Sequence, residues 1–390
     1  MTIFLRCACA FLLALLVGCS SPGTQGSSAL TMTGHAGHLI AIGGAINDDN
    51  APVYERFVAL ASATTPGRPP HILIAAAASA DQAAGATSKT KSLRTYSPTA
   101  VIDVITRETP TEQTVALIDQ ATAIFFTGGD QKRITDRYRP AGKSTPELEA
   151  MRRLLARGGV IAGTSAGDAM MSDPMFLTGR SAEALGIVST RSNPNQDADP
   201  EAPKNAKPVI GPQIGRGMGL IPWVITDSHF FERNRFGRLV AALETSGHRL
   251  GLGVGENAAV EIDLATGELV GLSTACTLLV DAGGLSRDGL TRRGVRARVI
   301  AQGTRLSLTK LLASPKPPAA TALTGTPQEI PPTQSGQKGL PASVQFFTRA
   351  AAGGSWILKL DGYEQIGRPD DTAPEPNVWS IVEIRPSAGN

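Results

Sequence analysis

Short apolar runs alternate with longer amphipathic stretches along most of the chain. The apolar runs occupy residues 39–42, 72–78, 101–105, 122–127, 159–162, 222–227 and 251–254. They lack polar alternation, which predicts strands in a sheet that is covered on both faces. Helical patterns occupy residues 52–63, 111–120 and 146–157, and the stop signal Gly158-Gly159 follows the last of them. This alternation predicts an α/β fold with a largely parallel sheet and helices on both faces.

The rest of the chain divides by composition. Residues 38–310 form the expected main domain, in which residues 181–215 predict a long surface loop and residues 260–308 predict short antiparallel strands. Residues 311–341 are rich in proline and predict a linker. A small β region is predicted over residues 342–390, from strand-like pieces at 343–347, 355–360 and 378–384.

The first 37 residues predict export from the cytoplasm. Arg6 precedes the apolar segment 8–17, which is too short to span a bilayer comfortably. Residues 16–19 resemble a bacterial lipobox, so residues 1–18 are predicted to be a lipoprotein signal peptide and Cys19 the lipidated first residue. Residues 19–37 are small and polar, which predicts a flexible tether. Ser20 favours the outer membrane, on its periplasmic or its outer face; a plain secretory signal is the alternative.

Composition narrows the classes of partner and cofactor. Of the 390 residues, 42% are hydrophobic and 18% are charged, which fits a globular core. The net charge of +3 gives no reason to expect nucleic acid as a partner. Beyond the signal and Cys19 the only cysteine is Cys276, in an apolar run, so no disulfide is expected. No Cys/His spacing indicates zinc, and we expect neither a metal nor a cofactor.

Ser165 lies where a buried strand is predicted to end and a helix to begin. In open parallel α/β sheets, ligands bind at the carboxyl ends of the strands. Gly163 and Gly167 flank Ser165 as G-x-S-x-G, and small neighbours permit the strained turn of a nucleophile elbow. The backbone N–H of Ala166 would then face a developing oxyanion. A glycine- and serine-rich turn without catalytic function is the alternative.

A nucleophilic serine needs a general base and a group that orients the base. Of the five histidines, His229 alone follows a predicted strand, which makes it the expected base. Glu256 also follows a predicted strand and is the favoured orienting carboxylate, with Asp227 as its rival. The order Ser, His, Glu differs from the Ser, acid, His order of the α/β-hydrolases and argues against that family.

Two further groups of residues lie at strand ends. Gly129 is expected to donate a second oxyanion N–H beside Ala166, and Gln131 to bind a polar substrate group, with a simple turn as the alternative. Three arginines follow His229, namely Arg233, Arg235 and Arg238. Guanidinium groups bind carboxylates in a bidentate manner, so the cluster indicates an anionic substrate group. An ordinary basic helix face is the alternative.

Four motifs together resemble the cyanophycinase branch of the S51 serine peptidases. They are Phe126-Thr127-Gly128-Gly129-Asp130-Gln131, Gly163-Thr164-Ser165-Ala166-Gly167, Asp227-Ser228-His229-Phe230 with the three arginines, and Gly253-Val254-Gly255-Glu256-Asn257. They occur in the family's order within residues 38–310. The resemblance implies a class-I-glutamine-amidotransferase-like fold and a Ser-His-Glu triad. It also implies exo-type hydrolysis of cyanophycin, a poly-aspartate that carries arginine on each β-carboxyl, to β-Asp-Arg dipeptides.

The resemblance also implies which residues bind the substrate. These are Gln131, Asp227, Arg233, Arg235 and Arg238. Ser228 departs from the glutamine that the family commonly has before its catalytic histidine, and the shorter side chain would widen or redirect specificity. An aspartyl dipeptidase of the same superfamily and a non-catalytic lipoprotein that binds acidic or polysaccharide ligands are the alternatives. The expected partners are the polymer and, through lipid, the membrane; a homodimer is left open.

Overall fold

The computed structural model describes residues 36–187, 209–317, 326–330, 342–360, 362–370, 373 and 378–387. These residues all belong to one compact unit. The predicted signal peptide, Cys19 and nearly all of the tether lie outside the described residues, as do residues 188–208 and most of the predicted linker. Among the described residues, no helix combines the length and the apolar character that crossing a bilayer requires.

The first sheet contains the expected parallel strands. Its order is β15-β11-β10-β1-β5-β4-β2-β3. Five neighbouring strands are parallel: β1 (His38–Ile42), β5 (Val160–Thr164), β4 (Ala123–Phe126), β2 (His71–Ala75) and β3 (Val101–Ile105). Three more are antiparallel: β10 (Ala259–Asp263), β11 (Glu268–Gly271) and β15 (Arg305–Ser307). The parallel strands coincide with the first five apolar runs, which confirms that part of the prediction.

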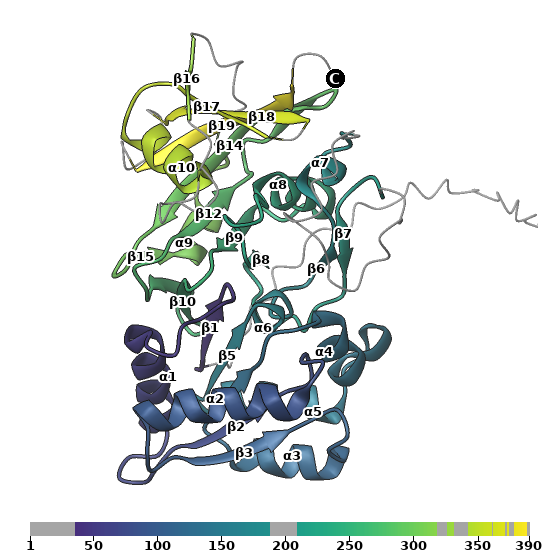
Figure 1. Cartoon of the computed structure of the whole chain (residues 1–390), viewed down its shortest axis with the longest axis vertical. Coiled ribbons are helices and arrows are strands. Elements are labelled where there is room, and N and C mark those ends of the chain that lie inside the picture. Colours follow the sequence, from purple (N-terminus) through teal and green to yellow (C-terminus); the bar gives the residue numbers. More distant parts are fainter. Residues whose placement is uncertain are drawn as a thin grey trace, which may run out of the picture. The chain divides into compact units, whose positions relative to one another are not determined.

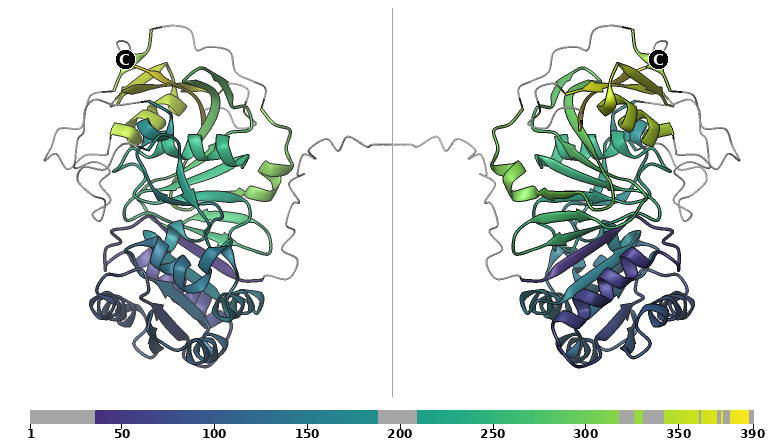
Figure 2. Two further views of the ribbon diagram at one scale, coloured as in Figure 1. Left: turned by 90° about the vertical axis from the view of Figure 1, so that its right-hand side faces the viewer. Right: turned by 90° about the vertical axis from the view of Figure 1, so that its left-hand side faces the viewer.

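Helices pack on both faces of this sheet, as its fully buried strands require. Ile40 and Ile42 of β1 share one hydrophobic cluster with side chains of α1 (Ala51–Ala63) and α2 (Gln82–Tyr96). Leu39 and Ala41 share another with side chains of α3 (Thr111–Gln120), α4 (Gln131–Tyr138) and α5 (Pro146–Ala156). The side views in Figure 2 show helices flanking the strands.

Local chemistry explains where these helices begin and end. The Thr145 side chain accepts a hydrogen bond from the N–H of Leu148 at the start of α5, and Pro146 occupies its first turn. Gly158, with a φ of 89°, follows its end. Asp81 caps α2 in the same way as Thr145 caps α5, and the sequence patterns did not single out that helix. A short 3-10 helix, η1 (Pro140–Gly142), follows α4.

A second sheet contains the last two predicted apolar runs. Its order is β16-β17-β18-β19-β14-β12-β9-β8, and β13 (Ser286–Asp288) pairs with β14. β8 (Val224–Asp227) and β9 (Leu250–Val254) are parallel neighbours, and α8 (Phe236–Ser246) connects them. The other members are β12 (Thr277–Asp281), β14 (Thr291–Ile300), β16 (Gln328–Glu329), β17 (Trp356–Lys359), β18 (Tyr363–Pro369) and β19 (Trp379–Pro386). An apolar run indicates a buried strand but does not reveal the strand's partner, so the sequence did not separate the two sheets.

The C-terminal residues extend this second sheet. β19 pairs with β14, and β18 pairs with β19, both in antiparallel register (Figure 1). The predicted strand at 343–347 is wrong, because these residues lie in α10 (Ala342–Ala352). Val344, Phe347 and Ala350 are buried at intervals of three residues, which is a helical period and not the period of a strand.

Two predictions for the middle of the chain need correction. The surface loop at 181–215 has regular structure at both ends: α7 (Ser181–Ala184) begins it, and β7 (Gln213–Gly215) pairs with β6 (Met175–Thr178). The strands at 260–308 are antiparallel as expected, but they are divided between the two large sheets. α9 (Leu308–Ala313) follows them and includes residues 311–313, which the sequence assigned to the linker.

Candidate active site

Ser165 occupies a strained turn between β5 and the short helix α6 (Ala166–Ala169). Its φ is 56°, a value that non-glycine residues seldom adopt. A β-carbon on Gly163 would lie 2.2 Å from the carbonyl oxygen of Gly167, and one on Gly167 would lie 2.8 Å from Phe126 Cβ. Both glycines are therefore needed for the turn to close. This is the geometry of the predicted nucleophile elbow.

Ser165, His229 and Glu256 form a continuous hydrogen-bonded chain. Ser165 Oγ lies 2.8 Å from His229 Nε2, and His229 Nδ1 lies 2.7 Å from Glu256 Oε1. The carboxylate accepts from Nδ1–H, which leaves Nε2 to accept the proton of the serine hydroxyl. The structure thus brings together the three residues that the strand ends indicated. Asp227, the rival carboxylate, is bonded to arginines instead.

The surroundings of His229 favour the neutral form of its imidazole. Burial is the largest influence and lowers its pKa below the ordinary value. The hydrogen bond to Glu256 opposes this shift, whereas the nearby charges of Arg233 and Arg235 reinforce it. The pKa of Glu256 is itself lowered, chiefly by its bond to His229. A neutral imidazole beside an ionised carboxylate is ready to act as a general base.

The loop after β4 lies against the serine. A β-carbon on Gly128 would lie 3.4 Å from Ser165 Cβ, and one on Gly129 would lie 2.1 Å from the carbonyl oxygen of Ala78. Gly129 also has a φ of 141°, so only glycine fits there without strain. Gly129 and Ser165 both line the same pocket, where the sequence predicted a second oxyanion donor.

A pocket of about 420 Å³ opens beside Ser165. Its size is within the range of small-molecule sites. The lining includes two members of this hydrogen-bonded chain, Ser165 and His229. It also includes every predicted substrate-binding residue: Gln131, Asp227, Arg233, Arg235 and Arg238. It also includes Ser228, the residue at the family's glutamine position, and Arg133, which the sequence patterns did not indicate.

The predicted substrate-binding residues differ in what they offer to a ligand. Gln131 Nε2 donates to the carbonyls of Phe176 at 2.9 Å and Leu177 at 2.7 Å, so its amide nitrogen anchors β6. Arg238 donates to both carboxylate oxygens of Asp227, at 2.8 and 2.6 Å, and its side chain is 5% exposed. These two residues form a buried ion pair, which supports the pocket wall more than it presents charge to a substrate.

Arg233 differs from its two neighbours. Arg235 donates to the carbonyl of Ser228 at 2.7 Å and to Asp227 at 3.3 Å. Within the described part of the chain, Arg233 forms no salt bridge with an acidic side chain. Among the described residues, the Arg233 guanidinium in this pocket is therefore not paired with a carboxylate that would neutralise its charge.

Asp168 is a buried acid beneath the pocket that sequence reasoning missed. It lies on α6 behind Ser165, is 0% exposed, and its carboxyl oxygens have no hydrogen-bond partner among the described residues. Burial raises its pKa well above the ordinary value, and Asp227 adds to the shift. A neutral acid here adds no negative charge to the arginine-rich pocket. The only sequence signal was an acidic residue directly after the G-x-S-x-G turn.

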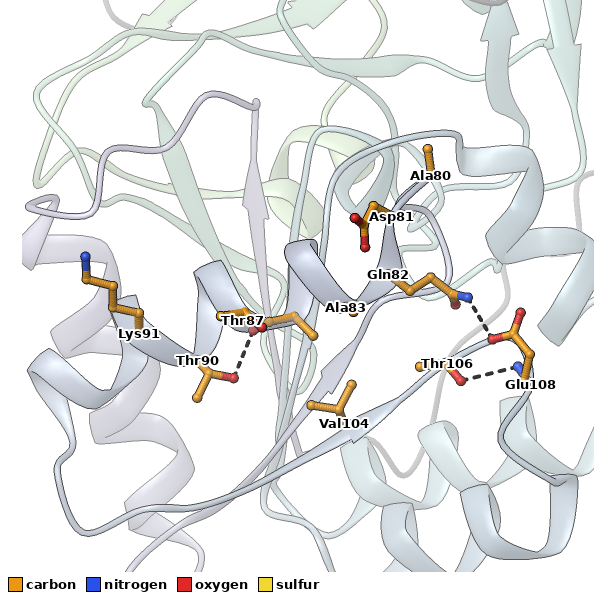
Figure 3. Close-up of a pocket in the computed structure, with 11 residues that line it drawn as sticks. Ala80, Asp81, Gln82, Ala83, Thr87, Thr90, Lys91, Val104, Thr106 and Glu108 are labelled. Atoms are coloured by element: carbon orange, nitrogen blue, oxygen red, sulfur yellow. Dashed lines mark hydrogen bonds between the residues drawn. The ribbon is translucent and has the colours of Figure 1, made fainter.

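A larger hollow of about 950 Å³ lies between α2 and β3 (Figure 3). Figure 3 shows Gln82 bonded to Glu108 across one end of it. No triad residue lines it, and it shares only Ala80 with the pocket beside Ser165. The smaller pocket is the candidate active site because the nucleophile and base open into it.

Comparison with known proteins places these features in a family. A family model described as peptidase family S51 matches residues 39–270. The chain belongs to this family. The matched region includes Ser165, His229 and Glu256. It also includes the loop after β4 and the arginines after His229, whereas the C-terminal strands lie beyond it.

Curated relatives carry the name cyanophycinase. The one from Nostoc sp. (strain PCC 7120) is 30% identical over 220 residues, which cover 53% of this chain and 64% of the relative. The one from Geminocystis herdmanii is 36% identical over 141 residues, or 36% of this chain and 42% of the relative. The chain thus spans less than two thirds of the length of these relatives. The crystal structure of a peptidase from an acI-B1 Actinobacterium is 16% identical with a TM-score of 0.48, and the match covers 70% of this chain and 98% of that chain.

Proposed function

We propose that this protein is a serine exopeptidase that hydrolyses cyanophycin to β-Asp-Arg dipeptides. The observation that carries the proposal is the chain of two short hydrogen bonds from Ser165 through His229 to Glu256, at the edge of an arginine-lined pocket. Membership of peptidase family S51 supports the hydrolytic chemistry. The name of the curated relatives supports the substrate.

The residues divide the reaction among them. Ser165 Oγ attacks the scissile carbonyl carbon while His229 Nε2 takes the hydroxyl proton. Glu256 stabilises the imidazolium that forms, and the N–H groups of Ala166 and Gly129 face the oxyanion. The tetrahedral intermediate then expels the amine, which takes the proton from His229, and an ester remains on Ser165. Water attacks this ester with His229 again as base, which releases the carboxylate product and restores the serine.

The charges in the pocket suit a substrate that carries both signs. Arg233 offers a bidentate donor for the α-carboxylate of the arginine that each aspartate carries. Asp130 and the amide oxygen of Gln131 line the same pocket and supply acceptors for a guanidinium. The polymer presents both groups in each unit. A volume of about 420 Å³ suits one terminal unit at a time, which agrees with attack at chain ends.

The direct test is incubation of the purified protein with cyanophycin, followed by mass spectrometry of the soluble products. The proposal predicts β-Asp-Arg as the main product from the earliest times, without longer intermediates. Release of longer oligomers would contradict the exo mode of attack. No release by a protein with a native circular dichroism spectrum would contradict the proposed substrate.

Ser228 gives a specific reason to test a second substrate class. Its short side chain lines the pocket at the position where the family commonly has glutamine. The space could admit other groups beside the aspartate, as in an aspartyl dipeptidase. A panel of Asp-X dipeptides should therefore accompany the polymer. Hydrolysis of the dipeptides without hydrolysis of the polymer would favour the dipeptidase.

We also propose that the mature protein is anchored to the outer membrane through lipid on Cys19. The support comes from the sequence of residues 1–20 alone. Labelling with a radioactive fatty acid in a bacterial host tests this proposal. The full chain should incorporate the label and the Cys19→Ser variant should not. An unlabelled wild type, cleaved and exported, would indicate a plain secretory signal.

A further inference from the structure

The end of β1 is bonded to all three segments that carry the triad. Three successive carbonyls there accept backbone N–H groups: that of Ile42 from Ser165 at 2.9 Å, that of Gly43 from His229 at 2.7 Å, and that of Gly44 from Asn257 at 2.8 Å. Asn257 directly follows Glu256. One short stretch of backbone therefore fixes the nucleophile, the base and the turn that carries the orienting carboxylate.

Asn50 ties the turn after Glu256 to the loop that follows β1. Its Nδ2 donates to the main-chain oxygen of Asn257 at 3.0 Å and to Asn257 Oδ1 at 2.9 Å. The main-chain N–H of Asn47 donates to the same Oδ1 at 3.0 Å. Asn257 has a φ of 55°, in the left-handed region, where a side chain other than glycine needs support from its surroundings.

The position of Asn50 in the chain makes this contact unusual. Asn50 is the N-cap residue of α1, where an asparagine normally accepts a bond from the first turn of its own helix. Its side chain makes no capping bond, whereas those of Asp81 and Thr145 do cap α2 and α5. Instead, the side chain donates to Asn257, which is 207 residues away in the sequence. Departures from a local rule of this kind gather at functional sites.

We propose that Asn50 is a positioning residue that holds Glu256 in place against His229. It acts through Asn257, whose fixed backbone keeps Glu256 Oε1 at 2.7 Å from His229 Nδ1. The Glu256 side chain is 38% exposed, so packing alone does not hold it there. The inference rests on the proposed hydrolytic function, and it adds a residue that touches none of the reacting atoms.

The test compares wild type and Asn50→Ala in steady-state hydrolysis of cyanophycin across a range of pH. The variant should lose about tenfold to a hundredfold in kcat, because a misplacement of about 1 Å in a catalytic group has effects of that order. KM should stay near the wild-type value, since Asn50 does not line the pocket. The acid limb of kcat/KM should move to lower pH. A displaced Glu256 would lose its hydrogen bond with His229 Nδ1, and that hydrogen bond raises the pKa of His229.

A double-mutant comparison shows whether Asn50 acts through Glu256. In a Glu256→Gln background, Asn50→Ala should cost much less in kcat than it does in the wild type, because the group that it positions is already lost. An equal loss in both backgrounds would overturn the proposal. Asp49→Asn is the matched control, because Asp49 is an exposed neighbour in the same loop, and its kinetics should match the wild type.

A second variant keeps the test decisive if Asn50→Ala does not fold. Asn257→Gly retains the left-handed turn, the N–H bond to Gly44 and the main-chain oxygen that accepts from Asn50, but it removes Oδ1, which accepts from both Asn50 and Asn47. It should show the same shift of the acid limb with a smaller loss in kcat. An unchanged limb in this variant would overturn the proposal. An inactive wild type would instead contradict the proposed function, so the two failures are distinguishable.

Discussion

Gly44 leaves the space that the imidazole of His229 occupies. A β-carbon on Gly44 would lie 2.3 Å from His229 Cε1 and 2.5 Å from Nε2. Gly44 also has a φ of 109°, which a residue with a side chain adopts only with strain. The residues after β1 therefore position His229 in two ways. Gly43 accepts its backbone N–H, and Gly44 has no side chain that would overlap the imidazole.

Replacing Gly44 by alanine should displace the imidazole from Ser165. We expect kcat/KM to fall by about 100-fold or more, the scale that follows from a misplacement of about 1 Å. Gly67→Ala is the matched control, because its φ of 77° gives similar backbone strain but its β-carbon would meet nothing within 4 Å. A Gly44→Ala enzyme with wild-type kinetics would show that His229 is not the base.

The pH dependence of kcat/KM should report the pKa of His229. The base must be neutral to accept a proton, so activity is lost as the pH falls through this pKa. Because burial lowers the pKa from 6.5, the acid limb should lie below that value. Arg233→Gln removes a positive neighbour and should move the limb upward, whereas Glu256→Gln removes the bond that raises the pKa and should move it downward. Shifts in the same direction would contradict this account.

Removing Arg238 should destabilise the fold, because it leaves the carboxylate of Asp227 buried and short of its main partner. Asp227 is 1% exposed, and breaking such a pair from one side costs about 3–5 kcal/mol. Urea unfolding of Arg238→Ala measures the loss. Arg305→Ala is the control, since Arg305 is 66% exposed and its pair with Glu268 should contribute only about 0–1 kcal/mol. Undiminished stability with a raised KM would mean that Arg238 binds substrate directly.

Removing Arg233 should weaken substrate binding and leave stability nearly unchanged. A hydrogen bond to a charged group contributes about 1.5–3 kcal/mol, so KM for the polymer should rise about tenfold to a hundredfold in Arg233→Ala. The rates should be compared well above the acid limb, where the altered pKa of His229 has no effect. A fall in kcat at constant KM would indicate that Arg233 acts on the transition state instead.

The sequence was sufficient to indicate that Ser165, His229 and Glu256 lie together, because each of them follows a short apolar run. Ser165, His229 and Glu256 all lie just after a strand, and carboxyl ends of parallel strands meet at one edge of a sheet. The three side chains meet although β5 belongs to one sheet and β8 and β9 to another. The assignment of strands to sheets could not be predicted, since periodicity reports burial and not pairing.

The supporting residues could not be found in this way. Asn50 reads as an ordinary helix cap, and only the structure shows that its side chain turns to Asn257. Gly44 resembles an ordinary glycine at the end of a strand. The local sequence does not show that the imidazole of His229 fills the space where its side chain would lie. The sequence indicates Arg238 as a substrate ligand together with its neighbours, whereas its burial against Asp227 depends on contacts with β6 and Gly179. Long-range contacts decide each of these cases.

The initial rates of β-Asp-Arg release by wild type and Ser165→Ala, on the same cyanophycin preparation, test the central claim most directly. The substitution removes the nucleophilic oxygen and leaves the pocket intact, so the variant should keep its unfolding midpoint and lose nearly all activity. We expect a fall of about 1,000-fold or more, in line with other serine triads. A Ser165→Ala protein that releases the dipeptide at the wild-type rate would contradict the claim.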